Sequence, residues 1–460
     1  MQRYKSLFFT LLIPLTGLLP FKTSAQELDP VLKDLIQKGL NKSHSININN
    51  DDAEQAKIDQ KLAKSVFLPK LTFNGSFTRL NDDITFDNDT QNLLTATQKL
   101  LVKEAVGLPF NAIFPENMLL TDIKNLQDKN ILKSSVDVDW VLFSGFEANN
   151  AIKASKHKEV SLNYLGMAEK DKVALKIIET YNNLALVYAS KKVLTTSETY
   201  LNEQEHYVKK AIENGLTTPI SRKKIELAQQ QLASKKLEFE HNKTLLIEVL
   251  HKLTGESREQ LSILMPKLES FELNSLSETE KRNEIKALEE AKNASLFKAK
   301  MEKNHVIPKI ALKGHYEFVE DDLSLLDPQW YVGVGIKWHI FDGNESRLKS
   351  KKSLLESEKY NEQLKEAEDM ISLSIVKAKL TYEASLQNIK IVLKEIEIAD
   401  DTYNIVSKQY KNNLASITDV LDAITDVEKA HFKLQESFFK QRNAYTELLH
   451  ANGTLSNQYN

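Results

Sequence analysis

The chain has 460 residues, no cysteine, 13 glycines, 10 prolines, 27% charged residues and a formal net charge of −3. This composition argues against a disordered chain, a disulfide scaffold and a polybasic nucleic-acid-binding protein, so no nucleic-acid partner is expected. Ordinary glycine usage would give roughly 32 glycines, and none lies between Gly343 and Gly453. Long segments without helix breakers indicate very long helices rather than a compact enzyme with many tight turns.

Residues 1–25 have the pattern of a signal peptide. Arg3 and Lys5 precede an apolar run at 7–21, and small residues stand before Gln26, where the mature chain is expected to begin. As a membrane anchor the run would be short, since ~20 residues are needed to span a bilayer, and two prolines interrupt it. No later stretch is long and apolar enough to span, so a mature protein that enters a membrane does so without a helix.

An internal repeat organises the rest of the chain. The segment Trp140–Gly145 reappears 198 residues later as Trp338–Gly343. Upstream, residues 68–77 match residues 307–316 at the larger offset of 239. The first repeat therefore carries an insertion within roughly 81–130.

Four short segments alternate between apolar and polar residues, as β-strands do. They lie at about 70–79, 134–143, 309–318 and 331–341. Their length is close to the ~9–11 residues of a tilted membrane strand. A water-soluble sheet, half buried on a core, gives the same alternation.

Long helical segments follow each pair of strands. In the second repeat apolar residues keep a seven-residue spacing, which is typical of coiled-coil-like packing. The members of this stripe are Ile375, Tyr382, Ile389, Ile396, Tyr403 and Tyr410. At ~1.5 Å per residue, the helix predicted from Ala148 to Glu213 would be about 100 Å long, more than three times a bilayer core of ~30 Å.

These elements predict five divisions of the chain. They are a signal peptide at 1–25, a first repeat at 26–255, a linker at 256–281, a second repeat at 282–453 and a C-terminal tail at 454–460. The first repeat contains the insertion at about 81–130 and a helical hairpin at 146–254, and the second contains a helical hairpin at 344–452.

The combination resembles the TolC-type outer-membrane efflux proteins over essentially the whole mature chain. The signs are the tandem duplication, the strand ending in Phe341-Asp342-Gly343 before a long helix, the Leu/Ile-Pro before the first strand of each repeat, and Asp419-Val-Leu-Asp422-Ala423 after a helical turn. The resemblance implies a mainly α fold with a small β part. Long helical hairpins form a periplasmic tunnel, and four strands per subunit contribute to a 12-stranded transmembrane β-barrel of a homotrimer. Four antiparallel strands cannot close a barrel alone, which independently requires several copies.

The function implied by the resemblance is that of an outer-membrane exit duct in a tripartite efflux or type I secretion system, which conducts substrates passively from a periplasmic pump assembly to the outside. Its partners would be a periplasmic adaptor protein, an inner-membrane pump and outer-membrane lipid. The location would be the cell outer membrane, extending into the periplasm. The transported substrate, the type of pump, the resting state of the duct and the choice between efflux and protein secretion stay open.

No catalytic or cofactor motif stands beside this pattern. The sequence has no His-Glu-x-x-His, no phosphate-binding glycine-rich loop and no Gly-x-Ser-x-Gly, and its ten histidines are dispersed. We therefore expect that the protein is not an enzyme and that it binds neither a cofactor nor a metal ion. The rival hypothesis is a periplasmic coiled-coil adaptor or scaffold with a soluble β-domain.

The two helical turns carry the first set of candidate site residues. Gly215 suits a left-handed helix C-cap, with Asn413 in its place in the second repeat, and Ser416 to Asp419 resembles a capping box. Thr218 is expected as an N-cap before Pro219. By the resemblance, the turns are tips that contact the adaptor through Asn214, Gly215, Leu216, Thr217, Asn413, Leu414, Ala415 and Ser416.

Asp419 and Asp422 form the second set, one helical turn apart. Three copies would place six carboxylates around one constriction, and rings of acids favour cations. Asp419 could equally be an acid that stabilises a helix N-terminus. Ala415 stands where the best-known family members carry a basic residue, which leaves the closing salt bridges open.

The third set, Trp140 and Trp338, suits the aromatic belt at a barrel interface. The insertion at 81–130 could plug or shield the mouth of the duct, or dock a surface partner.

Overall fold

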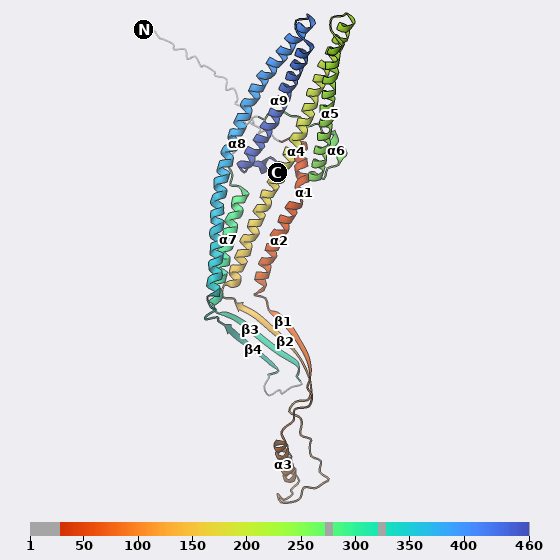
Figure 1. Ribbon diagram of the computed structural model, residues 1–460. Coiled ribbons are helices and arrows are strands. Elements are labelled where there is room, and N and C mark those ends of the chain that lie inside the picture. Colours follow the sequence, from red (N-terminus) through yellow and green to blue (C-terminus); the bar gives the residue numbers. More distant parts are fainter. Residues whose placement is uncertain (1–27, 272–278, 321–327, 460) are drawn as a thin grey trace, which may run out of the picture. The chain divides into compact units, whose positions relative to one another are not determined.

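The computed structural model describes residues 28–271, 279–320 and 328–459 (Figure 1). The predicted signal peptide lies outside these residues, as does part of the predicted linker. The first repeat contains helices α1 (Pro30–Lys42) and α2 (His44–Ser65), strand β1 (Lys70–Arg79), helix α3 (Asn88–Ala105), strand β2 (Asn130–Phe143), and helices α4 (Glu147–Glu213) and α5 (Pro219–Thr254). After α6 (Arg258–Ile263), the second repeat contains α7 (Asn283–Lys303), η1 (Asn304–Val306), β3 (Lys309–Glu320), β4 (Trp330–Lys337), α8 (Glu345–Lys411) and α9 (Ile417–Ala451). The short helix η2 (Leu455–Gln458) follows in the segment predicted as a C-terminal tail. None of the helices in the described ranges is long and apolar enough to cross a membrane.

The contacts divide the chain into two compact units. The helical unit consists of the chain up to Ile48, Gly166–Glu284 and Ala367–Asn460. The sheet unit consists of Asn49–Leu165 and Ile285–Glu366. The mainly α architecture with a small β part, expected from the sequence, is confirmed.

In the sheet unit the four strands form one antiparallel sheet in the order β1-β2-β3-β4. The register places Phe73 opposite Val136, and Val136 opposite Tyr316. Apolar side chains therefore line up across the strands on one face. All ten residues of β1 are exposed, and so are seven of the eight in β4. In the described part of the chain, no element covers the apolar face of the sheet.

Strand β4 is shorter than predicted. It ends at Lys337, which pairs with Lys309, whereas the alternation predicted a strand up to 341. The residue before Lys309 is a proline, which has no N–H to continue the ladder. Trp338 and the residues after it therefore leave the sheet before α8 begins.

Both repeats turn from strand to helix through the same backbone conformation. Gly145 and Phe146 have φ of 64°, and Gly343 and Asn344 have φ of 66°. Two consecutive left-handed residues are rare, and a bulky phenylalanine in this region is an outlier. The duplication has thus kept a demanding turn although the second residue differs between the copies.

The helical unit has a coiled-coil-like core. Near the tips Leu194, Leu201 and Val208 of α4 are buried at heptad spacing. Two aromatic pairs join α4 to α8: the ring centroids of Tyr200 and Tyr403 lie 4.6 Å apart, and those of Tyr207 and Tyr410 lie 5.5 Å apart. Figure 1 shows α4–α5 and α8–α9 as two helical hairpins.

The segment predicted as a C-terminal tail packs onto this unit. Tyr459 is buried, and its hydroxyl donates a hydrogen bond to Asp171 Oδ1 at 2.5 Å. The pKa of Tyr459 is raised, because burial and the neighbouring carboxylate both disfavour the phenolate.

The two glycines at the strand–helix turns provide a matched pair of substitutions. An added Cβ at Gly145 would lie 3.0 Å from the carbonyl oxygen of Ile307, whereas no described atom lies within 4 Å at Gly343. In both variants the alanine must adopt the left-handed φ of the glycine, which costs about 1–2 kcal/mol of folding free energy. We expect Gly145→Ala to lower the midpoint of thermal unfolding, followed by circular dichroism, more than Gly343→Ala. Equal losses would show that the contact with Ile307 adds nothing.

Candidate functional site

The two helical tips have the same backbone geometry. At the first, Gly215 has φ of 70°, and the N–H of Leu216 donates to the carbonyl of Ala211 at 2.8 Å. At the second, Asn413 has φ of 58°, and the N–H of Leu414 donates to Gln409 at 2.9 Å. Both are Schellman turns, in which the left-handed residue satisfies the last helical carbonyls. The prediction that Asn413 takes the place of Gly215 as the left-handed residue is confirmed. Asparagine adopts this conformation more readily than most residues with a side chain.

The helix starts after the tips differ. At Ser416 the predicted capping box is complete: its N–H donates to Asp419 Oδ2 at 2.7 Å, and Asp419 N–H donates to Ser416 Oγ at 3.3 Å. Thr218 occupies the N-cap position of α5, but its side chain makes no capping hydrogen bond. Thr217 instead pairs its hydroxyl with Ser221 at 2.8 Å.

The side chains of the tips are largely open to solvent. Leu216 is 58% exposed and Leu414, at the equivalent position 198 residues later, is 78% exposed. Asn214, Asn413 and Ser416 are also exposed, while Thr217 and Ala415 are half-buried. Each tip thus presents one leucine, surrounded by polar groups.

Asp419 and Asp422 are both exposed on the first turns of α9. The carboxylate of Asp419 is engaged in the capping box. Hydrogen bonds from the backbone N–H and side chain of Ser416 lower its pKa, and the charge of Lys224 adds to the effect. The helix-stabilising role that the sequence left as an alternative for Asp419 is therefore present, whereas Asp422 takes no part in the box.

Lys224 links the two hairpins, which the sequence did not reveal. Its Nζ donates to Thr418 Oγ1 at 2.5 Å, so a base from α5 meets the start of α9. Position 224 of the first repeat corresponds to position 422 of the second, so a lysine in one copy stands where the other has an aspartate. This difference in charge was the feature of the sequence that could have drawn attention to Lys224. Only packing of α5 beside α9 brings Lys224 to Thr418, so the spacing alone could not show it.

The two predicted belt tryptophans form equivalent hydrogen bonds in the sheet unit. Trp140 Nε1 donates to the carbonyl of Phe67 at 2.8 Å, and Trp338 Nε1 donates to that of Val306 at 3.0 Å. Each accepting residue stands directly before the Leu-Pro or Ile-Pro that opens the first strand of its repeat. Each tryptophan therefore ties the end of one strand to the start of its neighbour while its ring remains exposed.

The opposite face of the sheet carries a polar network. Asp137 lies at its centre, with Oδ1 2.7 Å from His315 Nδ1 and Oδ2 accepting from Asn74 Nδ2 at 2.5 Å. Lys313 and Asp139 are 3.8 Å apart on the same face. The sheet thus has one apolar and one charged, hydrogen-bonded face.

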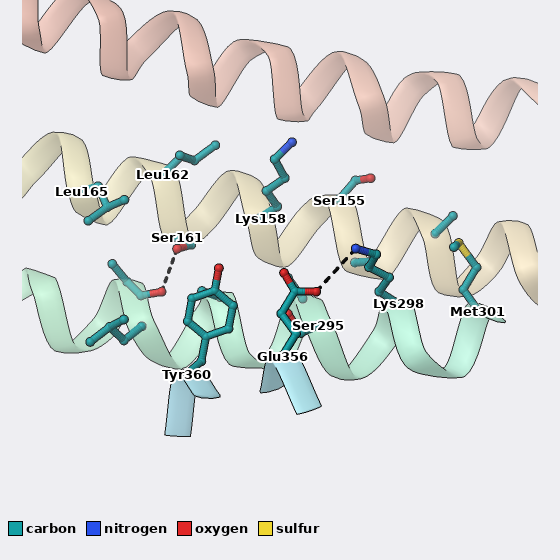
Figure 2. A pocket seen from close by; sticks show the side chains of 16 residues that line it. Ser155, Lys158, Ser161, Leu162, Leu165, Ser295, Lys298, Met301, Glu356 and Tyr360 are labelled. Atoms are coloured by element: carbon teal, nitrogen blue, oxygen red, sulfur yellow. Dashed lines mark hydrogen bonds and ion pairs between the residues drawn. The ribbon is translucent and has the colours of Figure 1, made fainter. Parts of the chain in front are cut away.

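A groove of about 600 Å³ runs between α4, α7 and α8 in the sheet unit (Figure 2). Small and apolar side chains line most of it, including Ala154, Leu165 and Ala291. Two polar links cross it: Ser161 Oγ donates to the carbonyl of Ala287 at 2.7 Å, and Lys298 lies 3.5 Å from Glu356. This arrangement offers space between helices rather than a convergent set of catalytic groups. In the ranges that the structure describes, no three His, Asp or Glu side chains gather as metal ligands.

Known proteins share both the sequence pattern of the second repeat and the fold of the whole. A family model described as "Outer membrane efflux protein" matches residues 277–454. No curated protein matches the sequence. The structure resembles the outer membrane protein VceC from Vibrio cholerae, with 15% identity, a TM-score of 0.71, and coverage of 92% of this chain and 96% of that one.

Two further solved structures have the same fold. One is the CmeC outer membrane channel of Campylobacter jejuni, with 15% identity, a TM-score of 0.70, and coverage of 93% of this chain and 86% of that one. The other is the open state of the MtrE outer membrane channel of Neisseria gonorrhoeae, with 13% identity, a TM-score of 0.66, and coverage of 93% and 90%. At these identities the likeness establishes the fold.

The lowered pKa of Asp419 predicts a pH-dependent tip. A carboxyl with a folded pKa below its unfolded value of ~3.9 stabilises the folded state above that value, and this contribution is lost as the pH falls through the lowered pKa. We expect faster hydrogen exchange at the Asp419 and Val420 amides at pH 3 than at pH 7, after correction for intrinsic rates. Asp419→Asn should abolish the difference and Asp422→Asn, outside the box, should keep it. A pH effect that survives in Asp419→Asn would contradict this assignment.

Proposed function

We propose that the chain is a member of the outer membrane efflux protein family, whose model matches residues 277–454, and that it is the outer-membrane exit duct of a tripartite efflux or type I secretion system. It conducts substrates passively from a periplasmic pump assembly to the outside. Export of small molecules is the preferred use, with protein secretion as the second. The channel names of the structural neighbours, CmeC and MtrE, support the same role.

The observation that carries the proposal is the bare apolar face of the four-stranded sheet. Its exposed residues include Leu71, Phe73, Val332 and Val334. A face of this kind costs free energy in water, at about 25 cal/mol per Å² of apolar surface, and is stable against lipid. The polar network around Asp137 on the other face suits a water-filled lumen.

The free edges of the sheet require more than one copy, and the number three is that of the family that the chain resembles. Strands β1 and β4 are the outer strands, and no described strand pairs with their outer edges. Unpaired N–H and C=O groups are unfavourable in a bilayer, so a membrane sheet must close into a barrel. Four strands are too few to close. Three copies, with β1 of one beside β4 of the next, give twelve strands in one barrel, and the protein is a homotrimer.

The helical tips are the contact points for a periplasmic adaptor protein. Leu216 and Leu414 are exposed at equivalent positions of rigid turns, which suits insertion into apolar pockets of a partner. The other adaptor-contacting residues are Asn214, Gly215, Thr217, Asn413, Ala415 and Ser416. An inner-membrane pump completes the assembly and selects the substrate.

The entrance of the duct is lined by Asp419 and Asp422 from three subunits. Of the two, Asp422 is the stronger determinant of ion selectivity, because the carboxylate of Asp419 is already engaged with Ser416. Trp140 and Trp338 lie at the barrel interface with lipid, where their hydrogen bonds hold the strand ends.

Purified protein should run as an SDS-resistant trimer and conduct cations in preference to anions in a planar bilayer. Asp422→Asn should lower the ratio of cation to anion permeability about twofold or more, since three charges leave the constriction. Asp52→Asn on α2 removes the same charge away from the tips and should leave the ratio unchanged.

A soluble monomer without conductance would contradict the proposal and favour the alternative, a periplasmic coiled-coil adaptor or scaffold protein. Equal selectivity in wild type and Asp422→Asn, with the trimer intact, would remove Asp422 from the constriction. Genes for a pump and an adaptor beside this one would identify the pathway.

A further inference from the structure

The insertion between β1 and β2 contains a helix with well-formed ends. At the start of α3, Asp87 Oδ1 accepts a hydrogen bond from the N–H of Thr90 at 2.7 Å. At its end Gly107 has φ of 72°, and the N–H of Leu108 donates to the carbonyl of Lys103 at 2.9 Å. An N-cap and a Schellman turn thus define both ends.

This helix nevertheless buries none of its residues in the single chain. Leu93 is 67% exposed and Leu101 is 66% exposed, and Ile113 in the following segment reaches 93%. An isolated helix of this length is marginal in water, so a capped helix with a bare apolar side implies a covering partner.

The insertion is held over the end of the β1–β2 pair. Beyond the strands, the N–H of Leu80 donates to the carbonyl of Lys129 at 2.7 Å, and that of Ile84 donates to Gln127 at 2.8 Å. Within the insertion, Lys103 Nζ donates to the carbonyl of Phe110 at 3.2 Å. The two arms of the insertion therefore continue the β1–β2 pair beyond the sheet, and α3 lies at the far end of these arms (Figure 1).

The partner follows from the dimensions of the proposed barrel. Twelve strands about 4.8 Å apart and tilted by about 40° form a ring with a radius of about 12 Å. A helix of 18 residues such as α3 is about 27 Å long. This length exceeds the radius, so an α3 that lies across the mouth reaches from the wall of the barrel to the threefold axis, where it meets the other two copies.

The sequence of α3 suits this self-association. Leucines at 93 and 100, and at 94 and 101, repeat with the seven-residue spacing of a coiled-coil seam. The charged residues are Asp89, Lys99, Lys103 and Glu104, two of each sign, so like copies do not repel one another through net charge.

We propose that the α3 helices of three subunits pack against each other through this leucine face and form an apolar cap over the outer mouth of the duct. The inference rests on the proposed trimeric duct. The cap narrows the exit when the duct is idle, and the helices separate when substrate passes.

The absence of cysteine from the chain makes single-cysteine cross-linking a clean test. Under mild oxidation, Leu93→Cys and Leu101→Cys should give a disulfide-linked dimer band from the purified trimer. Lys99→Cys, on the other side of α3, should give at least tenfold less. The disulfide at position 101 should lower single-channel conductance, and a reducing agent should restore it.

A second variant separates the cap from the fold of α3. Replacement of residues 85–126 by a short Gly-Ser turn should leave the SDS-resistant trimer and raise the conductance at rest. The proposed cap would be contradicted if the trimer were intact but the cysteines at 93 and 101 formed no cross-link. It would also be contradicted if the deletion left the trimer intact and the conductance unchanged. If lipid protects the thiol of the Leu101→Cys variant from maleimide, without cross-linking, the leucine face belongs to the membrane and the cap is also overturned. Loss of the trimer in the unmodified protein would refute the proposed function instead.

Discussion

The structure depends on one constraint: within the residues described, nothing covers the apolar face of the four-stranded antiparallel sheet and nothing pairs with its outer edges. The exposed residues of β1 and β4 show both deficits. Backbone groups and apolar side chains each need a partner, and in the proposed duct a bilayer together with further copies supplies both.

The duplication preserved geometry more strictly than residue identity. Gly145-Phe146 and Gly343-Asn344 share a left-handed pair of residues, and Gly215 and Asn413 share a Schellman turn. The two tryptophan hydrogen bonds also recur, although the accepting residues differ. Backbone conformation and hydrogen bonding at the junctions thus limit what the repeat tolerates, since an error there would misdirect a helix of 67 residues.

The tips show where the two copies have diverged in chemistry. Asp422 in the second repeat corresponds to Lys224 in the first, and Lys224 reaches across to Thr418. The charge of Lys224 also lowers the pKa of Asp419 at the start of α9, an effect that an acidic residue at this position would not have. If the proposed duct opens at this end, it needs contacts of moderate strength there, and exposed, solvent-screened polar contacts meet that requirement.

The sequence by itself determined the elements whose signals are local. Period-two alternation located the strands, the scarcity of glycine and proline indicated the long helices, and turn residues such as Gly215, Asn413 and Ser416 defined the tips. It did not determine where β4 ends, because that depends on Pro308, which directly precedes the neighbouring strand β3. Tertiary structure alone decided that Lys224 meets Thr418, that Trp140 and Trp338 bind backbone carbonyls, and that α3 keeps its leucines uncovered. These features rest on contacts between segments far apart in the chain, and spacing along a sequence carries no information on which distant groups come within hydrogen-bonding distance.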